Sequence, residues 1–217
     1  MHIQPLSSLR VSKYVVPAHN RIPNSSITNK PLLIYHSAFL APSSASSSPS
    51  SSSSSSTNAK TTPTNKPASI SPAAIEAHLH TTAAVVPQWR YTMYPTTHFH
   101  STTHEVLCVF SGRATLCFGG EANPGKVQTC VCAGDVLVVP AGVGHCLVRE
   151  EEEEEEEGVD AGAGKERFAM IGSYPPGCQW DMCYGNEGEE EKVEGIKELK
   201  WLEKDPVYGE EGPVLGV

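Results

Sequence analysis

The stretch "HFHSTTHEV", residues 98–106, places three histidines and a glutamate within nine positions of a 217-residue chain that has nine histidines in total. Side chains alternate across a β-strand, so His98 and His100 share one face. On an unbroken strand that face would also receive His104 rather than Glu105. The local pattern therefore indicates a metal site but leaves its third ligand open.

The segments on both sides of this stretch are typical of short strands. They are runs of β-branched or aromatic residues separated by Gly, Pro and Asn turns. The runs are "QWRYTMY", "EVLCVF", "ATLCFGG", "KVQTCVC", "DVLVVP", "HCLVR" and "RFAMIGSY". Many short strands at nearly even spacing indicate an all-β sandwich or barrel. One short helix is predicted near the N-terminal side, from Pro72 to His80, with Ser71 as its N-cap.

Two low-complexity runs divide the chain. A Ser/Thr/Pro-rich run and a run of eight glutamates cannot bury apolar surface, so both are expected to be disordered inserts. We therefore expect a flexible segment at 1–21 and the first strand region of a single domain at 22–41. The first insert follows at 42–69, and the rest of the domain at 70–217, with the acidic loop at 150–164.

Charge and composition limit the partners. Residues 1–75 contain no acid and six bases, whereas residues 76–217 carry 25 acids against ten bases, which argues against nucleic acid as a partner. No run of 18 apolar residues exists, so no membrane partner is expected. Seven cysteines without an export signal favour reduced thiols in the cytoplasm. The first sixteen residues faintly resemble a mitochondrial transit peptide, which leaves a mitochondrial location as the alternative.

Two motifs carry a family resemblance. The pattern H-x-H-x4-E-x6-G from His98 to Gly112 resembles the first cupin motif, although Thr92 stands where a glycine is usual. The pattern G-x5-P-x-G-x2-H from Gly134 to His145 resembles the second. The chain thus resembles the cupin superfamily, which implies a single-domain jelly roll, also called a double-stranded β-helix barrel.

The C-terminal third narrows the resemblance. The segments "GSYPPGCQWDMCYG", residues 172–185, and "DPVYGEEGPVLG", residues 205–216, are similar to the small single-domain cupins of bacteria and fungi often called YjlB-like. An aromatic and acidic cluster in the first segment is expected either to clamp the tail over the barrel or to cover the mouth of its pocket. Its members are Trp180, Asp181 and Tyr184.

The resemblance also implies a ligand set. In cupins the H-x-H pair ends one strand, a short turn follows, and the glutamate begins the next strand. The resemblance therefore implies that Glu105 points inward with His98 and His100. It further implies that His145 arrives from a neighbouring strand as the fourth metal ligand.

His104 is left with several roles. We expect a solvated or rim histidine, a residue that contacts a metal ligand or the substrate, or a ligand that replaces Glu105. Cys130 and Cys132, spaced C-x-C, share a strand face and form a minor alternative metal site.

The donor set of three neutral imidazoles and one carboxylate suits one divalent transition metal: Mn, Fe, Ni, Cu or Zn. Such an ion would retain a net charge of about +1, and in octahedral geometry two positions would stay open for a small-molecule substrate. Glu105 is also the candidate catalytic residue, because a ligating carboxylate can carry a proton.

The expected function is a metal-dependent oxidoreductase, either a dioxygenase or an oxalate-type oxidase, that acts on a small organic acid or enol. A metal-dependent isomerase or decarboxylase shares every ligand. A non-enzymatic small-molecule or metal-binding module is the third alternative, favoured if the barrel mouth is plugged. Homodimerisation through an exposed sheet is expected from the resemblance.

Overall fold

The computed structural model describes residues 1–42, 69–151 and 167–217. The strands are β1 His2–Ile3, β2 Arg10–Tyr14, β3 Leu32–His36, β4 Phe39–Leu40, β5 Val86–Tyr91, β6 Glu105–Ser111, β7 Arg113–Phe118, β8 Val127–Cys132, β9 Val136–Val139, β10 His145–Glu150 and β11 Ala169–Tyr174. The helices are α1 Ser25–Thr28, α2 Pro72–Thr82 and α3 Glu190–Gly195, with short 3-10 turns at Leu6–Ser8, Ile196–Glu198 and Pro213–Gly216.

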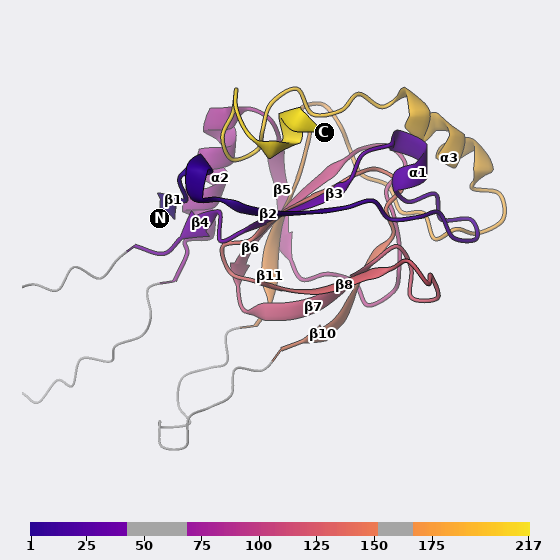
Figure 1. Ribbon diagram of the computed structural model, residues 1–217, viewed down its shortest axis with the longest axis horizontal. Coiled ribbons are helices and arrows are strands. Elements are labelled where there is room, and N and C mark those ends of the chain that lie inside the picture. The colour runs from indigo at the N-terminus through magenta and orange to yellow at the C-terminus, as the bar shows by residue number, and fades with distance from the viewer. Residues whose placement is uncertain (43–68, 152–166) are drawn as a thin grey trace, which may run out of the picture.

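The strands form two main sheets. One has six strands in the order β2-β3-β9-β6-β11-β5, and the other has three in the order β10-β7-β8. A separate pair joins β1 to β4, and all of these pairings are antiparallel. In Figure 1 the sheet that contains β7, β8 and β10 lies across the larger sheet. The predicted all-β jelly roll is thereby confirmed.

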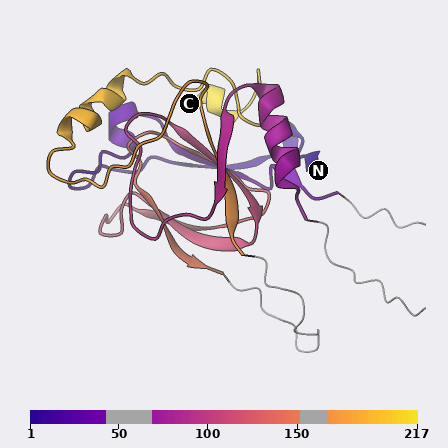
Figure 2. The same cartoon turned by 180° about the vertical axis from the view of Figure 1, so that it is seen from behind.

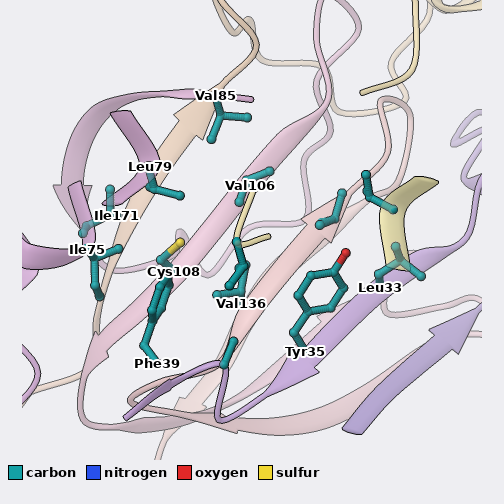
Figure 3. Close-up of a cluster of buried hydrophobic side chains, with 14 of the residues drawn as sticks. Leu33, Tyr35, Phe39, Ile75, Leu79, Val85, Val106, Cys108, Val136 and Ile171 are labelled. Atoms are coloured by element: carbon teal, nitrogen blue, oxygen red, sulfur yellow. The ribbon is translucent and has the colours of Figure 1, made fainter. Parts of the chain in front are cut away.

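The central strand β6 alternates between two hydrophobic cores. Val106 and Cys108 face an outer core, which Ile75 and Leu79 of α2 complete (Figure 3). Leu107 belongs to an inner core between the two sheets. Odd-numbered positions of β6 therefore point into the barrel, and even-numbered positions point out of it.

The helix predicted from Pro72 to His80 is confirmed and continues to Thr82. It lies alongside β5 (Figure 2), where Arg90 of β5 forms an ion pair with Glu76 of α2. The two shorter helices α1 and α3 were not predicted, because neither is long enough to show a helical period.

The expectation of a flexible segment at 1–21 is wrong. Five residues of this segment form β2, which pairs with β3 along the edge of the six-stranded sheet. Val16 is fully buried, and Ser12 Oγ lies 2.8 Å from His36 Nε2. An edge strand needs only one covered face and one partner, so its own sequence carries a weak strand pattern.

The expected inserts at 42–69 and 150–164 fall almost wholly outside the described residues. Within the part of the chain that the structure describes, no helix is both long and apolar enough to cross a membrane.

Asp205 joins the C-terminal segment to the outer face of the sheet. Its buried carboxylate accepts a 2.7 Å hydrogen bond from the hydroxyl of Tyr35 on β3. It also accepts backbone N–H bonds from Val207, Tyr208 and Val214. The carboxylate therefore satisfies four donors at once.

Replacing Asp205 with alanine is expected to lower the free energy of unfolding by about 2 kcal/mol, because these buried donors lose their acceptor. Urea denaturation at pH 7 measures the change. Glu203→Ala at a neighbouring exposed position is the control, and equal stability of the two variants would contradict the assignment.

Candidate metal centre

Three buried imidazoles meet at one point inside the barrel. The candidate ligand atoms of His98, His100 and His145 all lie within 4.8 Å of one another. A local antiparallel pairing causes this convergence. The His98 N–H donates to the His145 carbonyl at 3.2 Å, and the His145 N–H donates back at 2.8 Å. Because side chains alternate, His100 then returns to the face of His98.

Each of the three rings has its Nδ1 within hydrogen-bonding reach of a backbone carbonyl. The carbonyls belong to Thr96 for His98, at 3.0 Å, to Val143 for His145, at 2.9 Å, and to Asp181 for His100. A carbonyl can only accept, so Nδ1 must carry the proton and the Nε2 lone pair of a neutral ring is left free. This arrangement is typical of imidazoles that bind metal through Nε2.

Glu105 completes the cluster. Its Oε1 lies 3.3 Å from His100 Nε2, and its Oε2 lies 3.4 Å from His145 Nε2. Residues 101–104 belong to no strand, and β6 begins at Glu105. This break resets the alternation, so Glu105 shares the inward face of Leu107.

The Asp181 carboxylate holds the turn between the two strand ends. It accepts bonds of 2.7 Å from both the backbone N–H and the hydroxyl of Ser101. It also accepts a longer bond of 3.3 Å from the Thr102 hydroxyl. Asp181 thus fixes the turn through its side chain and His100 through its carbonyl. The sequence indicated Asp181 only as part of the cluster with Trp180 and Tyr184, not as a residue that holds this turn.

The surroundings of the cluster determine which of its side chains are ionised at neutral pH. Burial lowers the pKa of His98, and burial together with His98 lowers the pKa of His145 to about 3. Burial would raise the pKa of Glu105, but His100 and the Tyr174 hydroxyl lower it to about 2. Burial also opposes the charged form of His100, yet the Glu105 carboxylate outweighs it and raises the pKa of His100. At neutral pH the site therefore holds an ionised carboxylate beside neutral His98 and His145.

The residues present fit a bound cation. Glu105 Oε2 is buried and lacks a hydrogen-bond partner among the described residues. It faces the lone pair of His145 Nε2, and two buried acceptors 3.4 Å apart repel each other. A cation bound by both would replace this repulsion with two attractive contacts. Imidazole nitrogens combined with a carboxylate oxygen suit divalent transition metals.

The structure does not bring His104 to the cluster. Its ring is buried, so the expected solvated or rim position is wrong. His104 Nδ1 accepts a 2.9 Å bond from the Ala141 N–H, and its ring meets Trp201 edge to face at 4.8 Å. Burial lowers the pKa of His104 to about 4, so the ring is neutral at pH 7. It is excluded from the barrel because it precedes Glu105 by one residue, on the side of the C-terminal segment.

Replacing His104 with alanine is expected to lower the free energy of unfolding by about 1–2 kcal/mol and to leave metal affinity unchanged. The Ala141 N–H loses its acceptor and Trp201 loses its contact, but no donor of the cluster is touched. Urea denaturation and metal titration measure the two effects. A large loss of metal affinity without loss of stability would mean that His104 serves the cluster.

Tyr174 contacts the cluster directly and Trp89 contacts it through Tyr174, although their sequence context did not predict it. The Tyr174 hydroxyl donates a 2.7 Å bond to Glu105 Oε1 and accepts a 2.8 Å bond from Trp89 Nε1. A Cβ added at Gly172 would lie 2.0 Å from the Trp89 ring, so this glycine makes room for the indole. Both residues were expected only as strand residues, because a one-residue shift in the pairing of β11 with β5 decides what they face.

Tyr174→Phe is expected to weaken metal binding roughly 10-fold, as removal of a residue that orients a ligand commonly does. The substitution deletes only the hydroxyl that holds Glu105 Oε1. Competition with a chelator measures the affinity. Tyr208→Phe makes the same chemical change away from the cluster and is expected to have no effect, so equal losses in both variants would contradict this role.

The cluster forms one wall of a cavity of about 240 Å³. The other walls are mostly aromatic and thioether side chains from β5, β11 and the segments that follow these two strands. Tyr94 and Trp180 are about half exposed, 49% and 43%, and lie beside His98 and His100 respectively. The barrel mouth is therefore open to a small molecule, and Trp180 lies at its edge.

Comparisons with known proteins identify the family of the chain. A family model described as Cupin matches residues 43–155. The uncharacterized protein YjlB of Bacillus subtilis (strain 168) is 35% identical over 133 residues, which cover 59% of this chain and 68% of the relative.

Solved structures resemble parts of the chain. Procruciferin, an 11S globulin of Brassica napus, matches 46% of this chain and 21% of its own, with 16% identity and a TM-score of 0.31. A structure of oxalate decarboxylase matches 46% of this chain and 22% of its own, with 20% identity and a TM-score of 0.31. The chain thus spans about a fifth of the length of these two proteins.

Proposed function

Because this chain belongs to the cupin family, we propose that it binds one divalent transition metal ion and is a metal-dependent oxidoreductase of small molecules. The proposed ligands are His98, His100, His145 and Glu105. The observation that carries the proposal is their convergence at the wall of an open, mostly apolar cavity.

The chain's own residues would orient the metal ligands and accept a proton from the substrate. When bound, the ion would supply Lewis acidity and redox chemistry. The backbone carbonyls that hold the imidazoles fix the direction of the three nitrogen donors. Tyr174 occupies Glu105 Oε1, so Glu105 Oε2 is the oxygen that would bind the ion. We propose that Oε2 takes a proton from a substrate in the cavity when the carboxylate dissociates from the ion.

The proposed reaction is oxidation of a small organic acid or enol, by a dioxygenase or an oxidase. The open cavity favours a small-molecule enzyme over a module whose barrel mouth is plugged. An isomerase or decarboxylase would use the same residues, and consumption of oxygen separates these classes.

The test has two stages. Elemental analysis of the purified protein is expected to find about one transition-metal ion per chain. Oxygen-electrode assays across small acids and enols are then expected to find uptake that disappears in His145→Ala. Turnover of a substrate without oxygen uptake would contradict the oxidoreductase, and a wild-type protein that binds no metal would contradict the whole proposal.

Two further expectations stay predictions. We propose a cytoplasmic location, which microscopy of a tagged protein tests. We also propose a homodimer, which light scattering tests by giving the molar mass in solution.

A further inference from the structure

The cavity beside the cluster has an unusual lining. Three of the four methionines of the chain, Met93, Met170 and Met182, line it. Aromatic rings, those of Trp89 and Trp180 among them, supply much of the remaining wall. Thioethers are soft and adaptable, and they make favourable contacts with aromatic rings. This surface suits an apolar or aromatic group.

Among the residues that the structure describes, the cavity lining offers no unpaired lysine or arginine to a second carboxylate. Arg90 is the one lysine or arginine among the described residues that line it. Its guanidinium donates two bonds of 2.6 Å to the Glu76 carboxylate on α2. Arg90 also holds the pKa of Glu76 below its usual value, so the pair is fully ionised. The positive charge of Arg90 is therefore already balanced by the Glu76 carboxylate.

Charge balance then selects the ligand. A divalent ion held by three neutral imidazoles and the Glu105 carboxylate keeps a net charge of about +1. A monoanionic chelating group would neutralise this charge. A dianion such as oxalate would leave a negative charge in a buried, mostly apolar place, which is costly without a cation to pair with it.

The cavity is large enough to hold an aromatic ring together with the chelating group. An apolar cavity of about 150 Å³ is large enough to hold benzene. The cavity here is about 240 Å³ and opens at Trp180. A phenyl-sized group would thus leave space for the few atoms of an enolate.

We propose that the substrate is a monoanionic chelating compound, such as an enolate, that carries an aromatic or similarly apolar group, and that Trp180 and the three methionines bind this group. The inference rests on the proposed function. It narrows the substrate class to apolar enols and removes oxalate-type dicarboxylates.

Binding of hydroxamates to the zinc-loaded protein tests the proposal without turnover. Benzohydroxamate and acetohydroxamate present the same monoanionic chelating group and differ only in the apolar part, and oxalate supplies the dianion. Calorimetry gives each affinity, expressed relative to the affinity of the same compound for free zinc. We expect benzohydroxamate to bind roughly 10- to 30-fold more tightly than acetohydroxamate, and oxalate to bind weakest. Equal binding of the hydroxamates, or preference for oxalate, would overturn the inference.

Trp180→Ala locates the apolar group. This variant is expected to lose about 10-fold in benzohydroxamate affinity and to keep its acetohydroxamate affinity. Tyr184→Ala is the matched control, because Tyr184 is equally exposed at 43% but does not line the cavity. Equal losses for both hydroxamates in Trp180→Ala would contradict the assigned contact.

The outcomes also separate this inference from the proposed function. Zinc uptake is measured first. A protein that takes up no zinc contradicts the proposed function and the inference together. A protein that takes up zinc but does not prefer the phenyl compound contradicts the inference alone.

Discussion

His145→Ala is expected to lower the affinity for a divalent transition metal at least ~100-fold. Loss of a residue that merely orients a ligand costs up to about 100-fold, and loss of the ligand itself should cost no less. His145 is neutral at pH 7, and its Nε2 faces the orphaned oxygen of Glu105. In His145→Ala, Glu105 Oε2 loses the neighbouring nitrogen that would bind the same ion. Chelator competition and elemental analysis measure the loss.

His104→Ala is the matched control, because His104 and His145 are both only 2% exposed. Both substitutions remove a buried imidazole, but only one of the two rings belongs to the cluster. We expect full metal occupancy in His104→Ala and almost none in His145→Ala. Full occupancy in both variants would contradict the ligand assignment.

Glu105→Gln is expected to weaken metal binding at least ~100-fold, because it removes the one negative charge of the cluster and one proposed ligand while keeping the size of the side chain. The amide oxygen can still accept the Tyr174 hydroxyl, and the amide N–H can donate to His145 Nε2. The free energy of unfolding of the metal-free protein is therefore expected to change by less than about 1 kcal/mol. Metal titration and urea denaturation measure the two quantities.

This contrast separates a lost ligand from a damaged fold. Glu121→Gln, the same change at an exposed position, is the control and should affect neither quantity. A metal affinity that survives Glu105→Gln would exclude the carboxylate from the site. A large loss in the free energy of unfolding of Glu105→Gln would instead assign Glu105 a structural role.

The strands and the helix were predictable because their patterns are local. The alternation of β6 and the N-cap and proline of α2 each lie within one short segment. β2 was missed because an edge strand shows little pattern of its own and is defined by its pairing with β3. The order of the strands in each sheet likewise depends on contacts between distant segments, which no short window contains.

The cluster was predictable only in part. His98 and His100 follow from strand alternation, whereas the choice between His104 and Glu105 depends on a break in the strand that Asp181 holds from a distant segment. Tyr174 carried no signal, because its contact with Glu105 depends on how β11 pairs with its neighbours. The residues that line the cavity are likewise brought together by contacts between distant segments, so the sequence did not predict the lining.

X-ray absorption spectroscopy of the metal in the purified protein tests the central claim most directly, because it counts the atoms bound to the ion. For zinc, the ligand set of three imidazoles and Glu105 predicts imidazole nitrogens and a carboxylate oxygen at about 2.0–2.2 Å, with the multiple-scattering pattern of three imidazole rings. Sulfur at about 2.3 Å, as the Cys130 and Cys132 alternative would give, or a first shell without imidazole, would contradict the account.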